Sequence, residues 1–347
     1  MPAPLRIAST LRTLILGLAL AASFAGAARA DGVPREDCFP VERLDPAARA
    51  RAEELLLRAL DSEALYTIVG GVKPVSGSFA STRFAIKEPD TAKLDETRRA
   101  LSAFRCGDAY DAGMLIFKAV SGEHRMGHAW VAYRPSVRRM LADHQAFFGP
   151  YGVSPETPPT ELIEKMEHAP QPDRLRASGH FYGYPDHAVD FFVDAELKRA
   201  SSEDKKIVPR DFLSVPTFSA ATNKFVWAVP KGHQANDADR ALMTRSEPIF
   251  AEYRLRREHY IGEGKPGVVA LLRDWFDDGY GRCAPENARF DGLSNVPWPA
   301  APTFVETSAQ VEVQVQEPAP VPTTTYVPAW TQPAAPAGPF RRWRQAR

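Results

Sequence analysis

The chain is poor in cysteine, and its three cysteines form no CxxC motif. A zinc ribbon and a thioredoxin-like redox motif are therefore without support. In an oxidising compartment, such a set predicts one disulfide and one buried thiol. Because the ends of a domain are often close together, the pairing of Cys38 with Cys283 is preferred, while the two pairings that include Cys106 stay open.

Long apolar runs are missing beyond residue 30, so no segment there reaches the roughly twenty residues that cross a bilayer. Residues 1–30 are the exception. In this segment Arg6 and Arg12 precede the apolar run "TLILGLALAASFAGAARA", which ends in small residues. This pattern is typical of a secretory signal peptide, here cleaved after Ala30. Since a twin-arginine pair and a lipoprotein-type cysteine are also missing, we expect a soluble protein that is periplasmic or secreted.

The sequence has no net charge, since 43 Lys and Arg side chains balance 43 Asp and Glu. That balance gives no electrostatic reason to expect nucleic acid as a partner. The partner that we expect is instead a small molecule or a component of the cell envelope. The sequence leaves the oligomeric state open.

Complete catalytic motifs are missing as well. The sequence contains no GxSxG elbow and no SxxK motif followed by SDN and KTG. The segment "IVGGVKPVSGS" has glycines and a lysine but lacks the GxxxxGK[ST] spacing of a phosphate loop. No HExxH spacing supplies a helical zinc site either. These motifs therefore predict neither a cofactor nor a metal.

What the sequence does contain is a mixture of helices and short strands. Asp45 as N-cap and Pro46 at the first position begin a helix whose apolar residues recur at helical spacing as far as Leu60. Strand pairs are predicted over residues 113–120 with 127–135, and 211–219 with 223–232. Strands are also expected over 64–79, broken at Gly70-Gly71, and over 81–88. Further helices are expected over 90–107, 136–149, 185–201, 236–258 and 266–277, with a short one inside 153–170.

Strands joined directly to their neighbours favour antiparallel pairing. The predicted fold class is therefore α+β, with helices packed around a small antiparallel or mixed sheet in a single globular domain over residues 31–299. Residues 300–347 are rich in Pro, Ala, Thr and Gln and are nearly free of charge before the end. Such a segment buries too little apolar surface to offset its ordering entropy, so a disordered tail is predicted.

The stretch "SGHFYGYPDHAVDFF", residues 178–192, concentrates histidine, aspartate and tyrosine. Pro185 suits the first turn of a helix, and the helix dipole favours Asp186 just behind it. A projection at about 100° per residue separates an apolar face from an acidic one. The apolar face holds Ala188, Phe191, Phe192 and Ala195, and the acidic face holds Asp186, Asp190 and Asp194.

Three interpretations of this stretch stay open. In the first, Asp186 caps the helix while the tyrosines and phenylalanines belong to the core. In the second, His187 and an aspartate form a base with its orienting partner, and His180 contributes from the preceding loop. In the third, His180, Asp186 and His187 hold a metal ion. His128 is expected on the same strand face as Trp130, as a hydrogen-bonded core histidine or as a further site residue.

These observations lead to two functional hypotheses. The first is an exported, soluble protein of the periplasm or cell envelope with a binding or structural role. The second is a hydrolase-like enzyme whose catalytic residues are His180, Asp186 and His187, together with His128.

The end of the tail carries a testable expectation. The sequence closes on "RRWRQAR", in which four arginines surround a tryptophan, a combination suited to weak contact with an anionic surface such as lipid headgroups or cell-wall polymers. Deleting all residues after Trp298 should therefore loosen envelope association without unfolding the domain. Cell fractionation with circular dichroism of the truncated protein checks this, and unchanged fractionation would contradict the tether.

Overall fold

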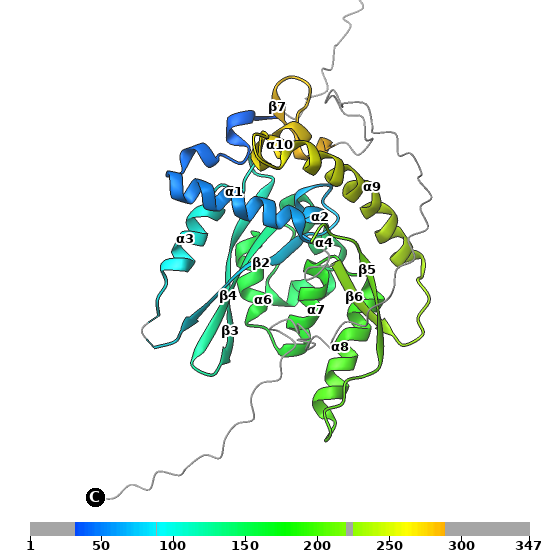
Figure 1. Ribbon diagram of the computed structural model, residues 1–347. Coiled ribbons are helices and arrows are strands. Elements are labelled where there is room, and N and C mark those ends of the chain that lie inside the picture. Colours follow the sequence, from blue (N-terminus) through cyan, green and yellow to red (C-terminus); the bar gives the residue numbers. More distant parts are fainter. Residues whose placement is uncertain (1–31, 88, 220–224, 289–347) are drawn as a thin grey trace, which may run out of the picture. The chain divides into compact units, whose positions relative to one another are not determined.

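An antiparallel sheet with the strand order β2–β4–β3 lies at the centre of the fold (Figure 1). The computed structural model describes residues 32–87, 89–219 and 225–288, so the predicted signal peptide and tail lie outside the described residues. The strands are β2 (Val75–Ala85), β3 (Tyr110–Ser121) and β4 (His124–Tyr133). The β3–β4 hairpin predicted from the sequence is confirmed.

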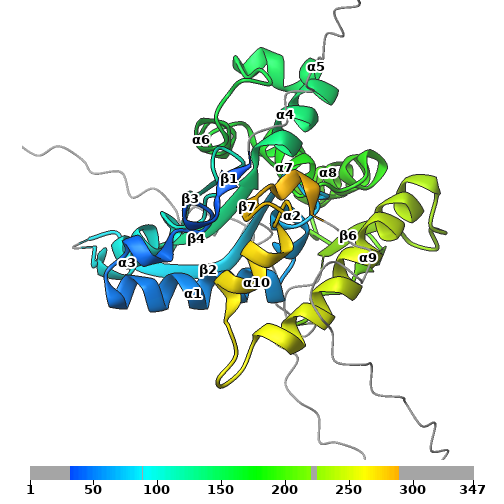
Figure 2. The ribbon, with the colours of Figure 1, turned by 90° about the horizontal axis from the view of Figure 1, so that it is seen from above.

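Both faces of this sheet are buried. Along β4, Ala129 and Val131 join the main core cluster, while Trp130 and Ala132 join a second cluster. Successive side chains of a strand point to opposite faces, so the two clusters lie on the two sides of the sheet. Figure 2 shows α1 and α3 on one side of the strands and α4 and α6 on the other. The covering helices are α1 (Pro46–Asp61), α2 (Leu65–Ile68) and α3 (Ala92–Leu101) on the first face, and α4 (Arg134–Asp143), α6 (Pro159–Glu167) and α7 (Gln171–Phe181) on the second.

A second hairpin and two C-terminal helices complete the main core. Strands β5 (Arg210–Val215) and β6 (Phe225–Pro230) pair antiparallel, as predicted. The other α-helices are α5 (Gln145–Phe148), α8 (Asp186–Ser201), α9 (Asp237–Tyr260) and α10 (Val268–Trp275). Short strands β1 (Val33–Pro34) and β7 (Arg282–Cys283) pair the two ends of the described chain. Short 3-10 turns are Arg35–Asp37, Val41–Arg43, Gly149–Tyr151 and Pro285–Asn287.

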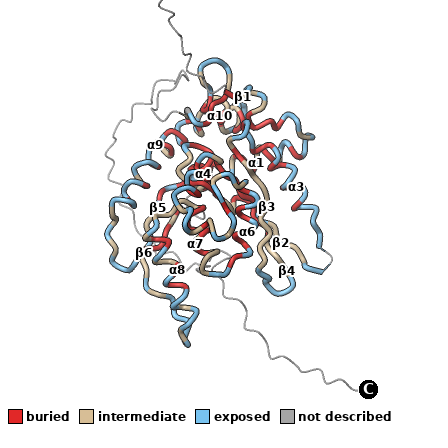
Figure 3. Tube along the Cα trace, turned by 180° about the vertical axis from the view of Figure 1, so that it is seen from behind, coloured by how far each residue is buried: buried red, intermediate tan, exposed pale blue. Residues whose placement is uncertain are grey.

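A local sequence signal accounts for the start of α1. The side chain of Asp45 accepts a hydrogen bond from the backbone N–H of Ala48 at 3.0 Å, which confirms it as the N-cap of α1. In α8 the three aspartates of the predicted acidic face are exposed, and Arg176 pairs with Asp190. The apolar face was only partly right: Ala188 and Ala195 are buried together with Val189 and Val193, whereas Phe191 and Phe192 are half-buried. Figure 3 shows exposure rising toward the C-terminal end of α8 and the β3–β4 turn.

One predicted strand is wrong. The strand expected over residues 64–79 is a short, wholly buried helix at Leu65–Ile68, followed by a strand that begins only at Val75. A short apolar run that is buried on all sides has no polar face, so its periodicity does not separate helix from strand. The strand then continues to Ala85 across a bulge between Gly77 and Ser81.

One disulfide and one buried thiol are present, as predicted, but the preferred pairing is wrong, because Cys38 pairs with Cys106 and the thiol of Cys283 is free. The two ends of the described chain do meet, as expected, but a closer contact decides the pairing. The backbone N–H of Phe39 donates to the carbonyl of Arg105 at 2.7 Å, and this pairing brings the Cα atoms of Cys38 and Cys106 to 3.9 Å.

The α+β class is confirmed by this arrangement. Within the described residues, none of the helices combines the length and apolarity needed to cross a membrane.

A buried ion pair lies where the α2–β2 connection meets β6. Lys73 has no exposed surface, and its Nζ lies 2.7 Å from Oε2 of Glu63. The same Nζ lies 4.3 Å from the ring centroid of Phe225, 5.2 Å from that of Tyr182 and 5.8 Å from that of Tyr184. Burial lowers the pKa of Lys73, and the Glu63 carboxylate opposes that shift. The ammonium therefore rests between three aromatic rings and one carboxylate, the arrangement that stabilises a desolvated cation.

Removing one partner of this pair should destabilise the fold. Glu63→Gln leaves Lys73 buried without a carboxylate, and we expect the free energy of unfolding to fall by about 3 kcal/mol. The double variant Glu63→Gln with Lys73→Met removes both charges and should recover part of that loss. Urea denaturation measures both values.

A matched control is Glu161→Gln, which removes an exposed pair with Lys165 at 3.1 Å. This variant should lower the free energy of unfolding by less than about 1 kcal/mol. Equal costs for Glu63→Gln and Glu161→Gln would contradict a special role for the buried pair.

Candidate functional site

The connection between α7 and α8 positions the residues singled out in the sequence. Gly183 in this connection has φ +68°, and a Cβ atom there would lie 3.1 Å from the carbonyl oxygen of Val72 and 3.4 Å from the Cα of Lys73. The connection therefore lies directly on the Lys73 segment, and only glycine adopts this left-handed conformation without strain at such close approach. The end of α7 and the start of α8 are fixed on either side of it.

On one side of the connection, His144, His180 and Asp186 form a compact group, which we name the His180 cluster. His180 lies in the last turn of α7, and its ring stacks on that of His144 with centroids 3.8 Å apart. Nδ1 of His180 and Nε2 of His144 each lie 3.6 Å from Oδ1 of Asp186. Two imidazole nitrogens are thus directed at one carboxylate oxygen.

His180 is the least solvated member of this cluster. Its side chain is 5% exposed, and its Nδ1 has no hydrogen-bond partner. Desolvation lowers the pKa of His180 to about 3, with smaller contributions from His144 and Arg176 in the same direction. The imidazole is therefore neutral near pH 7 and presents an unpartnered nitrogen to the cluster. Asp186, in contrast, is 70% exposed, so the cluster is open to solvent on that side.

On the other side, a fully buried carboxylate organises a second group, the Asp239 network. Asp239 lies in the first turn of α9, where it also completes a capping box with Asn236. The nitrogens facing its carboxylate are Trp227 Nε1 at 2.8 Å, the Asn236 backbone N at 3.0 Å, His233 Nε2 at 2.8 Å and His187 Nε2 at 3.3 Å.

Burial alone would raise the pKa of Asp239. The hydrogen bonds from His233, Asn236 and Trp227, helped by His187, outweigh burial and lower this pKa overall. The carboxylate is therefore ionised at neutral pH and surrounded by donors.

The side chain of Asn236 indicates which nitrogen of His187 carries the proton. Oδ1 of Asn236 accepts the backbone N–H of Asp239 at 3.0 Å, so its amide nitrogen faces Nδ1 of His187 at 3.3 Å. An amide N–H donates, so Nδ1 is unprotonated and neutral His187 carries its proton on Nε2, toward Asp239. Nε2 of His187 lies 3.3 Å from Oδ1 of Asp239 without forming a hydrogen bond, and ligand atoms of His187, His233 and Asp239 lie within 4.8 Å of one another.

The structure brings together only two of the four predicted site residues, His180 and Asp186. His187 belongs to the Asp239 network instead, because consecutive helical residues diverge by about 100°. His128 lies in β4 on the Trp130 face, is 6% exposed, and has its Nδ1 3.0 Å from Oγ of Ser78, as expected of a hydrogen-bonded core histidine. His180 was placed wrongly in a loop, since α7 extends through it to Phe181.

Three residues of these groups, His144, His233 and Asp239, were missed by sequence reasoning. His144 follows α4 in a stretch that predicted only a helix, and no local motif distinguishes it. For Asp239 a signal did exist, because Asn236 followed three residues later by an acidic residue is a helix-start pattern. That pattern predicts the cap but not the distant histidines.

A cavity of about 90 Å³ lies between α4 and the start of α6, and its lining includes none of these histidines. No protein-family model, curated protein or solved structure matches the chain. Function is therefore inferred from the geometry of the two groups.

Burial of His128 predicts a pH dependence of stability. Desolvation lowers the pKa of His128 in the folded state. As the pH falls below the ordinary value of about 6.5, the unfolded chain takes up a proton that the folded chain does not. Stability should therefore be full above this value and decline as the pH falls toward the lowered pKa.

His128→Gln should flatten the decline between about pH 7 and pH 5, by at most about 1.4 kcal/mol per pH unit. Urea denaturation at both pH values gives the slopes. His168→Gln, at the exposed C-terminal end of α6, is the control and should leave the slope unchanged. Identical slopes for wild type and His128→Gln would contradict the prediction.

Proposed function

We propose that the chain is an exported protein of the periplasm or cell envelope that binds a divalent transition-metal ion, such as Zn²⁺, in the His180 cluster. The observation that carries this proposal is the unpartnered Nδ1 of buried His180, directed with His144 at the carboxylate of Asp186. A buried nitrogen without a hydrogen-bond partner calls for an explanation, and beside the exposed carboxylate of Asp186 a bound ion supplies one.

The distances in the cluster suit such an ion. Ligand atoms about 2.1 Å from zinc lie about 3.4 Å apart at the tetrahedral angle. The observed oxygen–nitrogen separations are 3.6 Å, and all three ligand atoms lie within 4.8 Å of one another. Neutral imidazole and carboxylate are common ligands of zinc and of its neighbours in the transition series.

The location part of the proposal is supported by other features. Residues 1–30 have the pattern of a signal peptide, and the Cys38–Cys106 disulfide is compatible with an oxidising compartment. The Pro-rich segment with its basic aromatic end would supply weak attachment to an anionic envelope surface. The proposed partner is then a small molecule at the metal or a component of the envelope.

The exposure of Asp186 favours a second candidate function. Three protein ligands and an open fourth position are typical of catalytic zinc sites, in which the metal lowers the pKa of a bound water. The second candidate is therefore a metal-assisted hydrolase whose site consists of His144, His180 and Asp186. It retains His180 and Asp186 from the hydrolase hypothesis drawn from the sequence. In that reaction Asp186 and both histidines would hold the ion, and the open side would admit the substrate.

Metal titration tests the proposal. Chelator-treated protein spanning residues 31–347 is titrated with Zn²⁺ by isothermal calorimetry, and one equivalent should bind. His180→Gln and His144→Gln should each weaken binding at least about tenfold, because each removes a ligand. His168→Gln, which changes an exposed histidine outside the cluster, is the matched control and should bind as wild type.

Two results would overturn the assignment. Zinc binding that is equally strong in His180→Gln and His144→Gln would place any metal elsewhere. Loss of binding in His187→Gln alone would move the site to the Asp239 network.

A further inference from the structure

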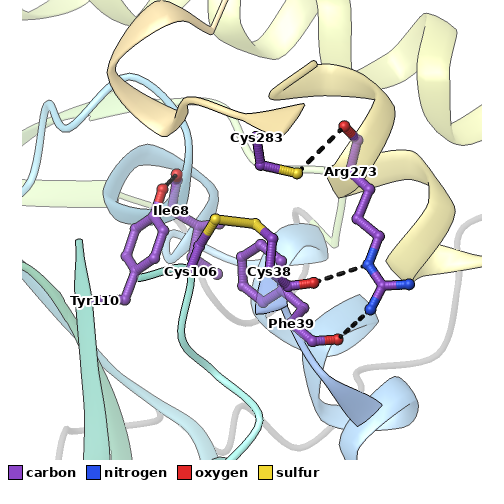
Figure 4. The surroundings of a disulfide bond; sticks show 7 residues. All are labelled: Cys38, Phe39, Ile68, Cys106, Tyr110, Arg273 and Cys283. Carbon is purple, nitrogen blue, oxygen red and sulfur yellow. Dashed lines mark hydrogen bonds between the residues drawn. A yellow bond between two sulfur atoms is a disulfide. The ribbon is translucent and has the colours of Figure 1, made fainter. Parts of the chain in front are cut away.

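Three buried sulfur atoms meet at the joined ends of the described chain. The side chains of Cys38, Cys106 and Cys283 have no exposed surface, and their three Sγ atoms lie within 4.8 Å of one another. Figure 4 shows the free thiol of Cys283 beside the Cys38–Cys106 disulfide. This group is separate from both histidine groups and from the proposed metal site.

Two sets of contacts hold the sulfur of Cys283 beside the disulfide. In the β1–β7 ladder Cys283 pairs with Val33, close in sequence to Cys38. From α10, the guanidinium of Arg273 donates to the carbonyl of Cys38 at 2.8 Å and to that of Phe39 at 3.2 Å (Figure 4). The same helix accepts a weak hydrogen bond from the thiol of Cys283, whose Sγ lies 3.8 Å from the carbonyl oxygen of Arg273. The thiol and the disulfide thus share one scaffold.

Burial keeps the thiol of Cys283 protonated under neutral conditions, since it raises the pKa to about 11. Nearby cations oppose this shift and nearby anions add to it. The charged and titratable groups facing the thiol are Arg35, Arg273, Asp274, Asp277 and the hydroxyl of Tyr110.

We infer that these three cysteines form an intramolecular thiol–disulfide exchange centre, in which Cys283 displaces one sulfur of the Cys38–Cys106 disulfide. The thiol of Cys283 first loses its proton, and the resulting thiolate attacks Sγ of Cys38 or Cys106. A new sulfur–sulfur bond forms as the old one breaks, and the displaced sulfur leaves with the electron pair as a thiolate that then takes up a proton. One disulfide and one thiol exist before and after, so no oxidant or reductant is consumed.

Exchange would change which segments are covalently joined. In the resting form, the disulfide ties the segment before α1 to the connection between α3 and β3. After exchange, one of these two segments would be tied to β7 instead. The centre therefore has two covalent states that differ in how the C-terminal end of the described chain is attached.

Trapping of free thiols in the native protein tests the inference. Protein incubated at about pH 7 or pH 9.5 is quenched in acid, alkylated under denaturing conditions, and digested without reduction for mass mapping. At the lower pH only Cys283 should carry the label. At the higher pH a fraction of molecules should carry it on Cys38 or Cys106, at a rate rising about tenfold per pH unit below the thiol pKa.

Two controls separate native exchange from scrambling after unfolding. Low urea, below the unfolding transition, should leave the exchange rate unchanged, whereas a rate that follows global unfolding would overturn the inference. Cys283→Ser should keep the Cys38–Cys106 disulfide and show no labelled cysteine at either pH.

A variant supplies an independent readout that needs no high pH. Cys106→Ser leaves Cys38 and Cys283 as the remaining pair, and the folded protein should join them when oxidised in air. If Cys106→Ser folds by circular dichroism with both thiols still free, and Cys283 alone is labelled in the native protein at every pH, the exchange centre is ruled out.

Discussion

The buried ammonium of Lys73 is the interaction on which the arrangement of both histidine groups depends. Its cation is held by Glu63 and by rings from two separate parts of the chain, the α7–α8 connection and the start of β6. The connection carries His180 and Asp186 at its ends, and β6 carries Trp227, which donates to Asp239. Because a desolvated cation has few acceptable positions, the pair fixes both segments relative to the central sheet.

Helix geometry then separates residues that are adjacent in the sequence. Asp186 and His187 are consecutive in α8, yet one faces His180 and the other faces Asp239. The two groups differ in the surroundings of their carboxylates, because Asp239 is buried and Asp186 is exposed. Every polar atom of the Asp239 carboxylate meets a donor, whereas Nδ1 of His180 has none. A buried carboxylate surrounded by donors favours stability, whereas the 70% exposed carboxylate of Asp186 beside an unpartnered nitrogen favours a ligand.

The sequence predicted several features that depend on neighbours along the chain. The N-cap at Asp45, the β3–β4 hairpin and the exposed aspartates of α8 all follow from local patterns. It was insufficient for contacts between distant segments, which local patterns do not encode. His144 contacts His180 because α4 and α7 cover the same face of the sheet. Cys38 lies beside Cys106 through a backbone pairing that no sequence motif predicts. The buried helix α2 was missed because a run without a polar face has no diagnostic period.

The Cys38–Cys106 bond also acts on the unfolded chain. Its partners are 68 residues apart, and the loop that it closes contains α1, α2, β2 and α3, together with Glu63 and Lys73. Closing a loop of that length removes about 4 kcal/mol of denatured-state entropy on the polymer estimate. The residues that cover one face of the sheet therefore stay confined near one another even when the native packing is lost. Refolding begins from a chain in which the search for the buried ion pair is already shortened.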